Sequence, residues 1–195
     1  MLKDATPFGL EEPLTGTEFS YFYKNGYSLQ YIDLSQFDTS EWTITSLYDT
    51  FMYCTALKYL DCSYFNTANW VITDATGCFE GLYSVSTINV STWDVSNWDN
   101  PYLDSTFSEC YEMIQLDLST WDVSNWGSCF LGYTFGNDGR IQVIKMNNWD
   151  ISNWTSINFS SCFYENYMLK YIPIQDWHPS SSLIVTSCYR TIESC

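Results

Sequence analysis

The sequence is poor in basic residues. It has 7 Lys and Arg against 23 Asp and Glu, which gives a formal net charge of −16. An excess of negative charge repels the phosphate backbone of nucleic acids and the anionic headgroups of lipids. We therefore predict that the protein binds neither nucleic acid nor a membrane surface. The charge suits solubility, a cation or a basic partner.

Metal-binding and secretion patterns are also missing. His178 is the only histidine, and none of the 8 cysteines forms a Cys-x-x-Cys pair, so a structural zinc site is not expected. No apolar run reaches the roughly 20 residues of a membrane span, and the start, MLKDATPFGLEEPL, has no apolar signal-peptide core. Without such an apolar run we expect no membrane insertion, and without a secretion signal we expect reduced cysteines.

What the sequence does have is a repeat of 28 residues. The hexapeptide WDVSNW occurs at 93–98 and 121–126, and WDISNW follows at 149–154. Successive repeats begin at Tyr31, Tyr59, Thr87, Gln115, Val143 and Tyr171. We call residues at the same place in successive repeats a column. One aromatic column consists of Phe37, Phe65, Trp93, Trp121, Trp149 and Trp177. Repeated apolar columns predict a solenoid, because each coil must bury its apolar face against the next.

The two halves of each repeat have different apolar spacing. The first half has an apolar-x-apolar step, such as Leu116-x-Leu118, which alternates with period two and predicts a short strand paired in parallel with the next coil. In the second half, SLYDTFMYCTAL at 46–57 spaces its apolar residues at three and four, which predicts a short helical turn. The prediction is a parallel β-solenoid with short strands and short helical turns, about six 28-residue coils long.

The ends of the chain depart from the repeat. Residues 1–30 are predicted to form an N-terminal cap and a partial repeat, and residues 31–170 form five repeats. Residues 171–195 are predicted to be a degenerate capping repeat, because Pro173 removes a backbone donor that a further strand would need.

One motif carries a resemblance to a known family. The pattern L-x-x-L-D-L-S-x-[FW]-D-[TV]-S-x-W, followed by F-x-x-C-x-x-L, resembles the BspA-like leucine-rich-repeat surface proteins. It occurs here as YIDLSQFDTSEW from Tyr31, QLDLSTWDVSNW from Gln115 and FMYCTAL from Phe51. Tryptophan stands where that family more often has valine after D-T-S-x. The resemblance implies a leucine-rich-repeat-like solenoid and surface adhesion or recognition, and it implies no enzymatic activity.

Several polar columns are interpreted as parts of the frame. Asp or Asn followed two residues later by Ser predicts an Asx-turn, with a ladder of cation ligands as the alternative. The aspartate column consists of Asp38, Asn66, Asp94, Asp122 and Asp150. The asparagines before the second tryptophan, Asn69, Asn97, Asn125 and Asn153, are expected to hydrogen-bond from coil to coil. Most cysteines fall in inward columns and are expected to be small buried side chains.

The outward positions of the strands are the best candidates for a binding site. The predicted ligand-binding residues are Tyr31, Asp33, Tyr59, Asp61, Asn89, Gln115, Asp117 and Tyr171. Tyrosine rings supply rigid apolar area and carboxylates supply orientation, which suits a glycan or a basic peptide. One alternative is a Ca²⁺ ion between Asp33 and Asp61, which would otherwise repel each other on neighbouring coils. A second alternative is an ordinary solvated surface.

These observations favour non-enzymatic recognition. We expect a protein or glycan receptor to bind the exposed strand face, with the protein located at a cell or virion surface. The alternative is a structural or decoration subunit of a virion or filament, which would form a homo-oligomer or larger assembly through its ends or lateral faces. No cofactor and no enzymatic activity are expected, because no nucleophile and base accompany His178 and the nearby Asp176.

Overall fold

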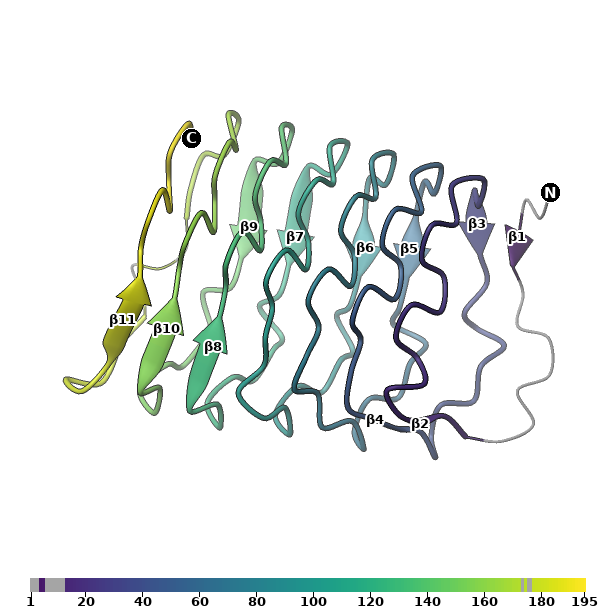
Figure 1. Ribbon diagram of the computed structural model, residues 1–195, viewed down its shortest axis with the longest axis horizontal. Coiled ribbons are helices and arrows are strands. Elements are labelled where there is room, and N and C mark those ends of the chain that lie inside the picture. The colour runs from purple at the N-terminus through teal and green to yellow at the C-terminus, as the bar shows by residue number, and fades with distance from the viewer. Residues whose placement is uncertain (1–3, 6–12, 173, 175–176) are drawn as a thin grey trace.

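The chain winds into a stack of coils, each lying beside the coil 28 residues later (Figure 1). This computed structural model describes residues 4–5, 13–172, 174 and 177–195. There are about six turns, and the strands pair in parallel wherever they pair. The predicted repeat solenoid is therefore confirmed. How the chain divides into cap, repeats and capping repeat stays a prediction, and Pro173 lies outside the described residues.

The predicted apolar-x-apolar steps form one line of short strands. This line consists of β1 (Asp4–Ala5), β3 (Tyr31–Ile32), β5 (Leu60–Asp61), β6 (Ile88–Asn89), β7 (Gln115–Asp117) and β9 (Val143–Lys145). The pairs are β1 with β3, β5 with β6, and β7 with β9. Leu60 pairs with Ile88, and Leu116 pairs with Ile144, so the strand register is the 28-residue repeat. The alternating pattern thus turns one side chain inward and the next toward solvent.

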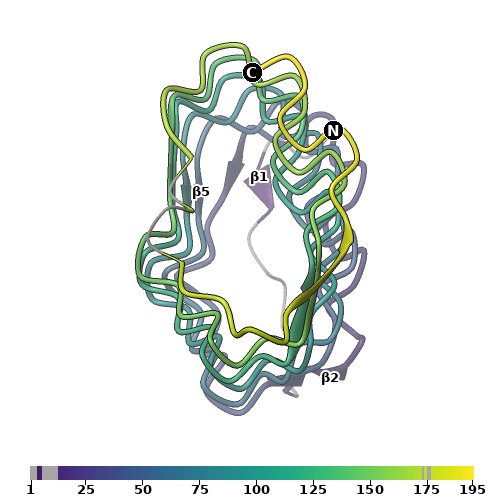
Figure 2. The same cartoon turned by 90° about the vertical axis from the view of Figure 1, so that its left-hand side faces the viewer.

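A second line of strands was not predicted. It consists of β2 (Thr15–Gly16), β4 (Thr43–Ile44), β8 (Ser128–Phe130), β10 (Ser156–Asn158) and β11 (Ile184–Ser187). The stack viewed end-on places it on the opposite long side of each coil (Figure 2). The line lacks regular alternation, and between β4 and β8 its strand pairing is reduced to isolated bridges at Ser46, Asp74, Tyr102 and Phe130. The second line therefore has no period-two pattern in the sequence.

The predicted short helical turns are wrong. Within the described residues no segment is helical, and the second half of each coil is a run of overlapping turns. The N–H groups of Asp49, Phe51 and Tyr53 donate to carbonyls of the next coil, whereas Thr50 and Met52 donate to the carbonyl three residues earlier. A helix would need all these donors within its own coil. Asp49 and Tyr53 also have left-handed φ values of 54° and 59°, which break a right-handed helix.

Stacked aromatic rings fill the interior. The first tryptophan column stacks with centroid distances of 6.3 Å for Trp93 and Trp121, 6.3 Å for Trp121 and Trp149, and 5.6 Å for Trp149 and Trp177. A phenylalanine column at 51, 79, 107, 135 and 163 stacks at 5.2 to 5.9 Å. Fully burying one such side chain contributes about 1.5–3 kcal/mol, so neighbouring coils hold each other in register.

The repeated hexapeptide forms one corner of each coil. The N–H groups of Ser96, Ser124 and Ser152 donate to the Oδ1 atoms of the aspartates two residues earlier, as predicted for Asx-turns. The Nδ2 atoms of Asn97 and Asn153 donate to carbonyls 29 residues earlier, so the predicted asparagine ladder is also confirmed. The motif is part of the frame, and function must be sought elsewhere on the surface.

Most of the cysteines are buried in the interior of the coils. Cys54, Cys62, Cys78, Cys110, Cys129 and Cys162 are buried and carry free thiols, while Cys188 and Cys195 in the last coil are exposed. Burial raises the pKa of the Cys54 thiol to about 11, which keeps it protonated at neutral pH. The interpretation of the inward cysteines as small buried side chains is confirmed.

Candidate functional site

The eight predicted ligand-binding residues lie along the outer side of the first strand line. Tyr31, Tyr59 and Tyr171 are 53%, 45% and 41% exposed. Gln115 is also exposed, and the polar residues Asp33, Asp61, Asn89 and Asp117 are half-buried. Asp61 pairs with Asn89 across β5 and β6, and Asp117 pairs with Lys145 across β7 and β9. We call this surface the strand face.

Asp61 is the most heavily hydrogen-bonded carboxylate on the strand face. Its Oδ1 accepts from the backbone N–H of Ser63 (3.0 Å), from Ser63 Oγ (2.6 Å) and from Asn89 Nδ2 (2.9 Å). Its Oδ2 accepts from the Tyr59 hydroxyl at 3.0 Å. Partial burial acts to raise the pKa of Asp61, but these hydrogen bonds outweigh it and hold the pKa below its ordinary value. Asp61 is thus ionised and fixes the orientation of the Tyr59 ring.

Asp117 and Asp33 are engaged in a similar way. Asp117 Oδ2 accepts from Lys145 Nζ at 2.8 Å, and its Oδ1 accepts from Ser119 Oγ at 2.6 Å. Asp33 Oδ1 accepts from the backbone N–H and the hydroxyl of Ser35. Among the described residues, no three His, Cys, Asp or Glu side chains converge so that they could hold a metal ion. The polar side chains of the strand face therefore mostly orient one another.

Residues of the strand face line a larger and a smaller hollow. The larger has a volume of about 330 Å³ and is lined by residues of three coils, among them Tyr59, Thr87, Asn89, Gln115, Asp117 and Thr120. The smaller has a volume of about 180 Å³ and is lined by residues that include Tyr31, Asp33, Tyr59, Asp61 and Tyr64. Tyr59 is a wall of both, which makes it the central side chain of the strand face.

Sequence reasoning missed several residues that line these hollows. Thr87 belongs to the column that holds tyrosine at 31, 59 and 171, and its small side chain leaves the larger hollow open. That exchange of Tyr for Thr was the available signal. Thr120 and Tyr64 follow the strands in the adjoining turns, outside the two alternating columns, so no strand pattern identifies them.

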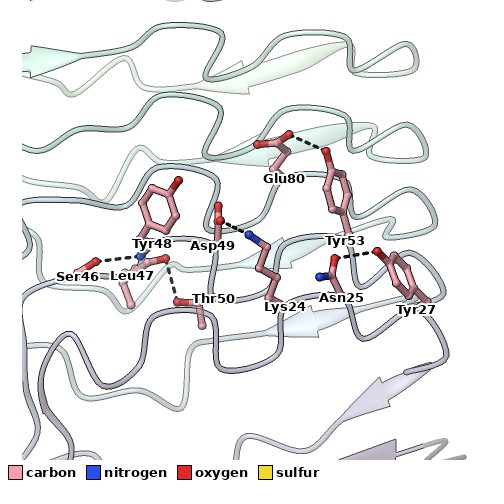
Figure 3. Close-up of polar contacts among 10 residues, drawn as sticks. All are labelled: Lys24, Asn25, Tyr27, Ser46, Leu47, Tyr48, Asp49, Thr50, Tyr53 and Glu80. Carbon is pink, nitrogen blue, oxygen red and sulfur yellow. Dashed lines mark hydrogen bonds and ion pairs between the residues drawn. The ribbon is translucent and has the colours of Figure 1, made fainter.

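A second polar surface lies on the turn side of the first coils (Figure 3). Lys24 Nζ forms an ion pair with Asp49 Oδ2 at 2.6 Å, and the Asp49 side chain is only 5% exposed. This hydrogen bond raises the pKa of Lys24. In the next coils the Tyr53 hydroxyl donates to Glu80, whose pKa is raised by burial. The chain's own lysine therefore compensates the most buried carboxylate of this surface.

His178 lies beside a shallow hollow of about 390 Å³ at the corner of the last coils, with Asn147, Trp149, Asp150 and Ser152. Asp150 Oδ1 accepts from the backbone N–H of Ser152, and hydrogen bonds from Ser152 lower the pKa of Asp150. The Asp150 carboxylate therefore stabilises its own turn. Asp176, which the sequence places near His178, lies outside the described residues.

Comparisons with known proteins identify the family and leave its activity open. Within the described residues, no helix is long and apolar enough to cross a bilayer. No curated protein and no solved structure matches the sequence. One family model matches residues 17–130 and again residues 45–159, which together cover more than half of the chain. The chain therefore belongs to the family described as Mycoplasma protein of unknown function, DUF285.

Proposed function

We propose that this chain is a non-enzymatic recognition protein that binds a protein or glycan receptor through the strand face. The observation that supports this most is the position of Tyr59, which is half-exposed, held by Asp61 and shared by two hollows. Fixed aromatic side chains beside polar groups give binding energy at a low entropic cost. None of the exposed tyrosines of this face belongs to the core.

The resemblance of the repeat motif to BspA-like surface proteins supports the same function. Those proteins are mostly used in adhesion or recognition, so we propose that this chain acts at a cell or virion surface. The receptor is a protein or a glycan, and no cofactor takes part. The negative charge of the chain disfavours nucleic acid and anionic lipid as partners.

Binding of the fluorescently labelled chain to a panel of animal and protist cells, measured by flow cytometry, tests this proposal. We expect Tyr59→Ala to weaken binding about tenfold or more, because a central aromatic contact is lost. Tyr27→Ala removes a tyrosine of similar exposure from the turn side and should leave binding unchanged. Equal binding by the parent chain and Tyr59→Ala, with unchanged circular dichroism, would contradict the proposal.

A second candidate function, as an assembly subunit, is favoured by the last coil. Ile184 and Val185 of β11 are 63% and 51% exposed. Val185 pairs with Ile157 of β10, which pairs with Cys129 of β8, and both of these inner residues are buried. Exposed apolar side chains beside a strand edge suit contact with another copy. Light scattering at increasing concentration decides this candidate, because a monodisperse monomer at every concentration argues against assembly.

A further inference from the structure

We infer that the larger hollow of the strand face, between Tyr59 and Gln115, is a binding site for one neutral sugar unit of a glycan. This inference rests on the proposed function and narrows its ligand from a protein or glycan to an uncharged glycan. Its volume of about 330 Å³ lies at the lower end of ligand pockets, which span roughly 300–1,000 Å³. A small ligand therefore fits it better than a protein surface does.

The hollow exists because one column changes side-chain size. Tyr59 stands at the first of the three coils, and Thr87 and Gln115 take the place of tyrosine in the next two. Neither Thr87 nor Gln115 has a ring, so the Tyr59 ring forms a wall beside a gap that is two coils wide. Neighbouring coils are about 4.8 Å apart at their strands. The Asp61 carboxylate accepts from the Tyr59 hydroxyl and holds that wall in place.

Inside the hollow, charge favours neither an anionic nor a cationic ligand. Asp117 is the only charged side chain that lines the hollow, and it is paired with Lys145 at 2.8 Å. The hollow itself is therefore close to neutral. The chain as a whole carries −16, so sialylated or sulfated glycans are repelled at long range. The neutral lining therefore suits an uncharged ligand, and the net charge adds a long-range penalty for an anionic one.

The hydrogen-bonding groups are those that bind sugar hydroxyls. The Thr87 hydroxyl, the Gln115 amide and the Thr120 hydroxyl have no side-chain hydrogen bond to any other described residue. They offer both donors and acceptors to a ligand in the hollow. The Tyr59 ring is a further part of the lining, and stacking an apolar ring face on it contributes binding energy. This pairing of one aromatic wall with several neutral polar groups suits a pyranose ring.

An extended peptide fits the same surface less well. A peptide bound to a sheet needs an open strand edge for its backbone or a series of apolar pockets for alternate side chains. Here β5 pairs along one edge of β6, and the coil that carries β7 lies along the other (Figure 1). Ile88, the aliphatic side chain of the lining, is only 4% exposed. The lining therefore gives a peptide no second apolar anchor besides Tyr59.

The test uses the full chain and the methyl glycosides of glucose, galactose, mannose and N-acetylglucosamine. Saturation-transfer NMR detects binding in the millimolar range, and calorimetry measures the affinity of the best of the four. Thr87→Tyr places in the gap the residue that the column has at 31, 59 and 171. We expect at least one glycoside to bind, and Thr87→Tyr and Gln115→Ala each to weaken it about tenfold or more. Tyr27→Ala on the turn side and N-acetylneuraminic acid are the matched controls, the first binding normally and the second not binding.

The outcomes separate this inference from the proposed function. If no glycoside gives saturation transfer, or if Thr87→Tyr binds as well as the parent chain, the sugar site is wrong. The proposed function still stands in that case, provided that cell binding depends on Tyr59 and survives periodate oxidation of the cell-surface glycans. If cell binding does not depend on Tyr59, the proposed function is wrong, whatever the glycosides do. Thermal unfolding of each variant confirms that it is folded.

Discussion

At the scale of single residues, Asp138 is a buried carboxyl group in a column of hydrogen-bond donors. One coil earlier, Cys110 Sγ donates to the carbonyl of Phe79, 31 residues before it. One coil later, Asn166 Nδ2 donates to the carbonyl of Phe135, also 31 residues before it. Asp138 Oδ1 accepts from the Cys110 N–H at 2.6 Å, and its buried Oδ2 has no hydrogen-bond partner. Oδ2 therefore stands where the neighbouring coils have a hydrogen-bond donor, which indicates that the carboxyl group of Asp138 is protonated.

The protonation of Asp138 should make stability depend on pH. Burial raises the pKa of Asp138 well above its usual range, opposed by the Cys110 hydrogen bond and assisted by the charge of Glu109. The folded state then keeps a proton that the unfolded chain releases above about pH 3.9, so this contribution to stability is present below that pH and is lost as the pH rises. Asp138→Asn supplies a donor at every pH. It should raise the free energy of unfolding by about 1–3 kcal/mol near neutral pH and by less in acid, measured by urea unfolding.

A matched control exists for this exchange. Asp122 is exposed and accepts from Ser124 in an Asx-turn, where the same column holds Asn66 in another coil. Asp122→Asn should therefore change stability little at either pH. If Asp138→Asn loses stability with rising pH as steeply as the parent chain, Asp138 is not the group responsible.

At the scale of the elements, the turn half of each coil depends on a fit between large and small residues. Gly81 and Tyr53 occupy the same column, and both have left-handed φ values, 70° and 59°. A Cβ added at Gly81 would overlap the Tyr53 ring of the coil before it. We expect Gly81→Ala to lower the free energy of unfolding by about 1–3 kcal/mol, through the overlap and the left-handed backbone.

A double-mutant cycle isolates the overlap from the backbone. In a Tyr53→Ala background the ring is gone, so Gly81→Ala should cost less, leaving mainly the penalty for its left-handed φ. Gly139→Ala is the matched control, because its Cβ would meet no atom within 4 Å and its φ is not left-handed. Equal costs for Gly81→Ala in both backgrounds would show that the ring is not the obstacle.

These elements also show how far the sequence could predict the structure. Period-two columns such as Leu60 and Leu116 predict the first strand line, because one side chain must point inward and the next outward. Apolar residues spaced at three and four do not distinguish a helix from overlapping turns. The outcome depends on whether the backbone N–H groups donate within their own coil or to carbonyls of the next coil. The outward columns identified the strand face, but the hollow depends on the size of Thr87 relative to its neighbours, which matters only once the coils are stacked.

At the scale of the whole molecule, stability should decrease from the middle coils toward the last one. Each coil contacts only its neighbours, so an inner coil is held on both sides. The core is continuous through the stacked tryptophans, and inner residues such as Leu116 and Ile144 are fully buried. In the last coil, β11 pairs with β10 alone, and Ile184 and Val185 remain exposed. The proposed sugar site is lined by Tyr59, which precedes β5, and by residues of β6 and β7, in the well-supported part of the stack.

Amide hydrogen exchange measures this gradient directly. We expect the hydrogen-bonded amides of β7 and β9 to exchange only through global unfolding, and those of β11 to exchange faster through local opening of the last coil. Raising the urea concentration should then accelerate β7 and β9 steeply and β11 only slightly, because local opening exposes little surface. If β11 is as protected as β7 and responds as steeply to urea, the chain unfolds as one cooperative unit and the coils do not fray in sequence. A rigid middle is what the proposed site requires, since a pre-formed hollow avoids the entropic cost of ordering its walls on binding.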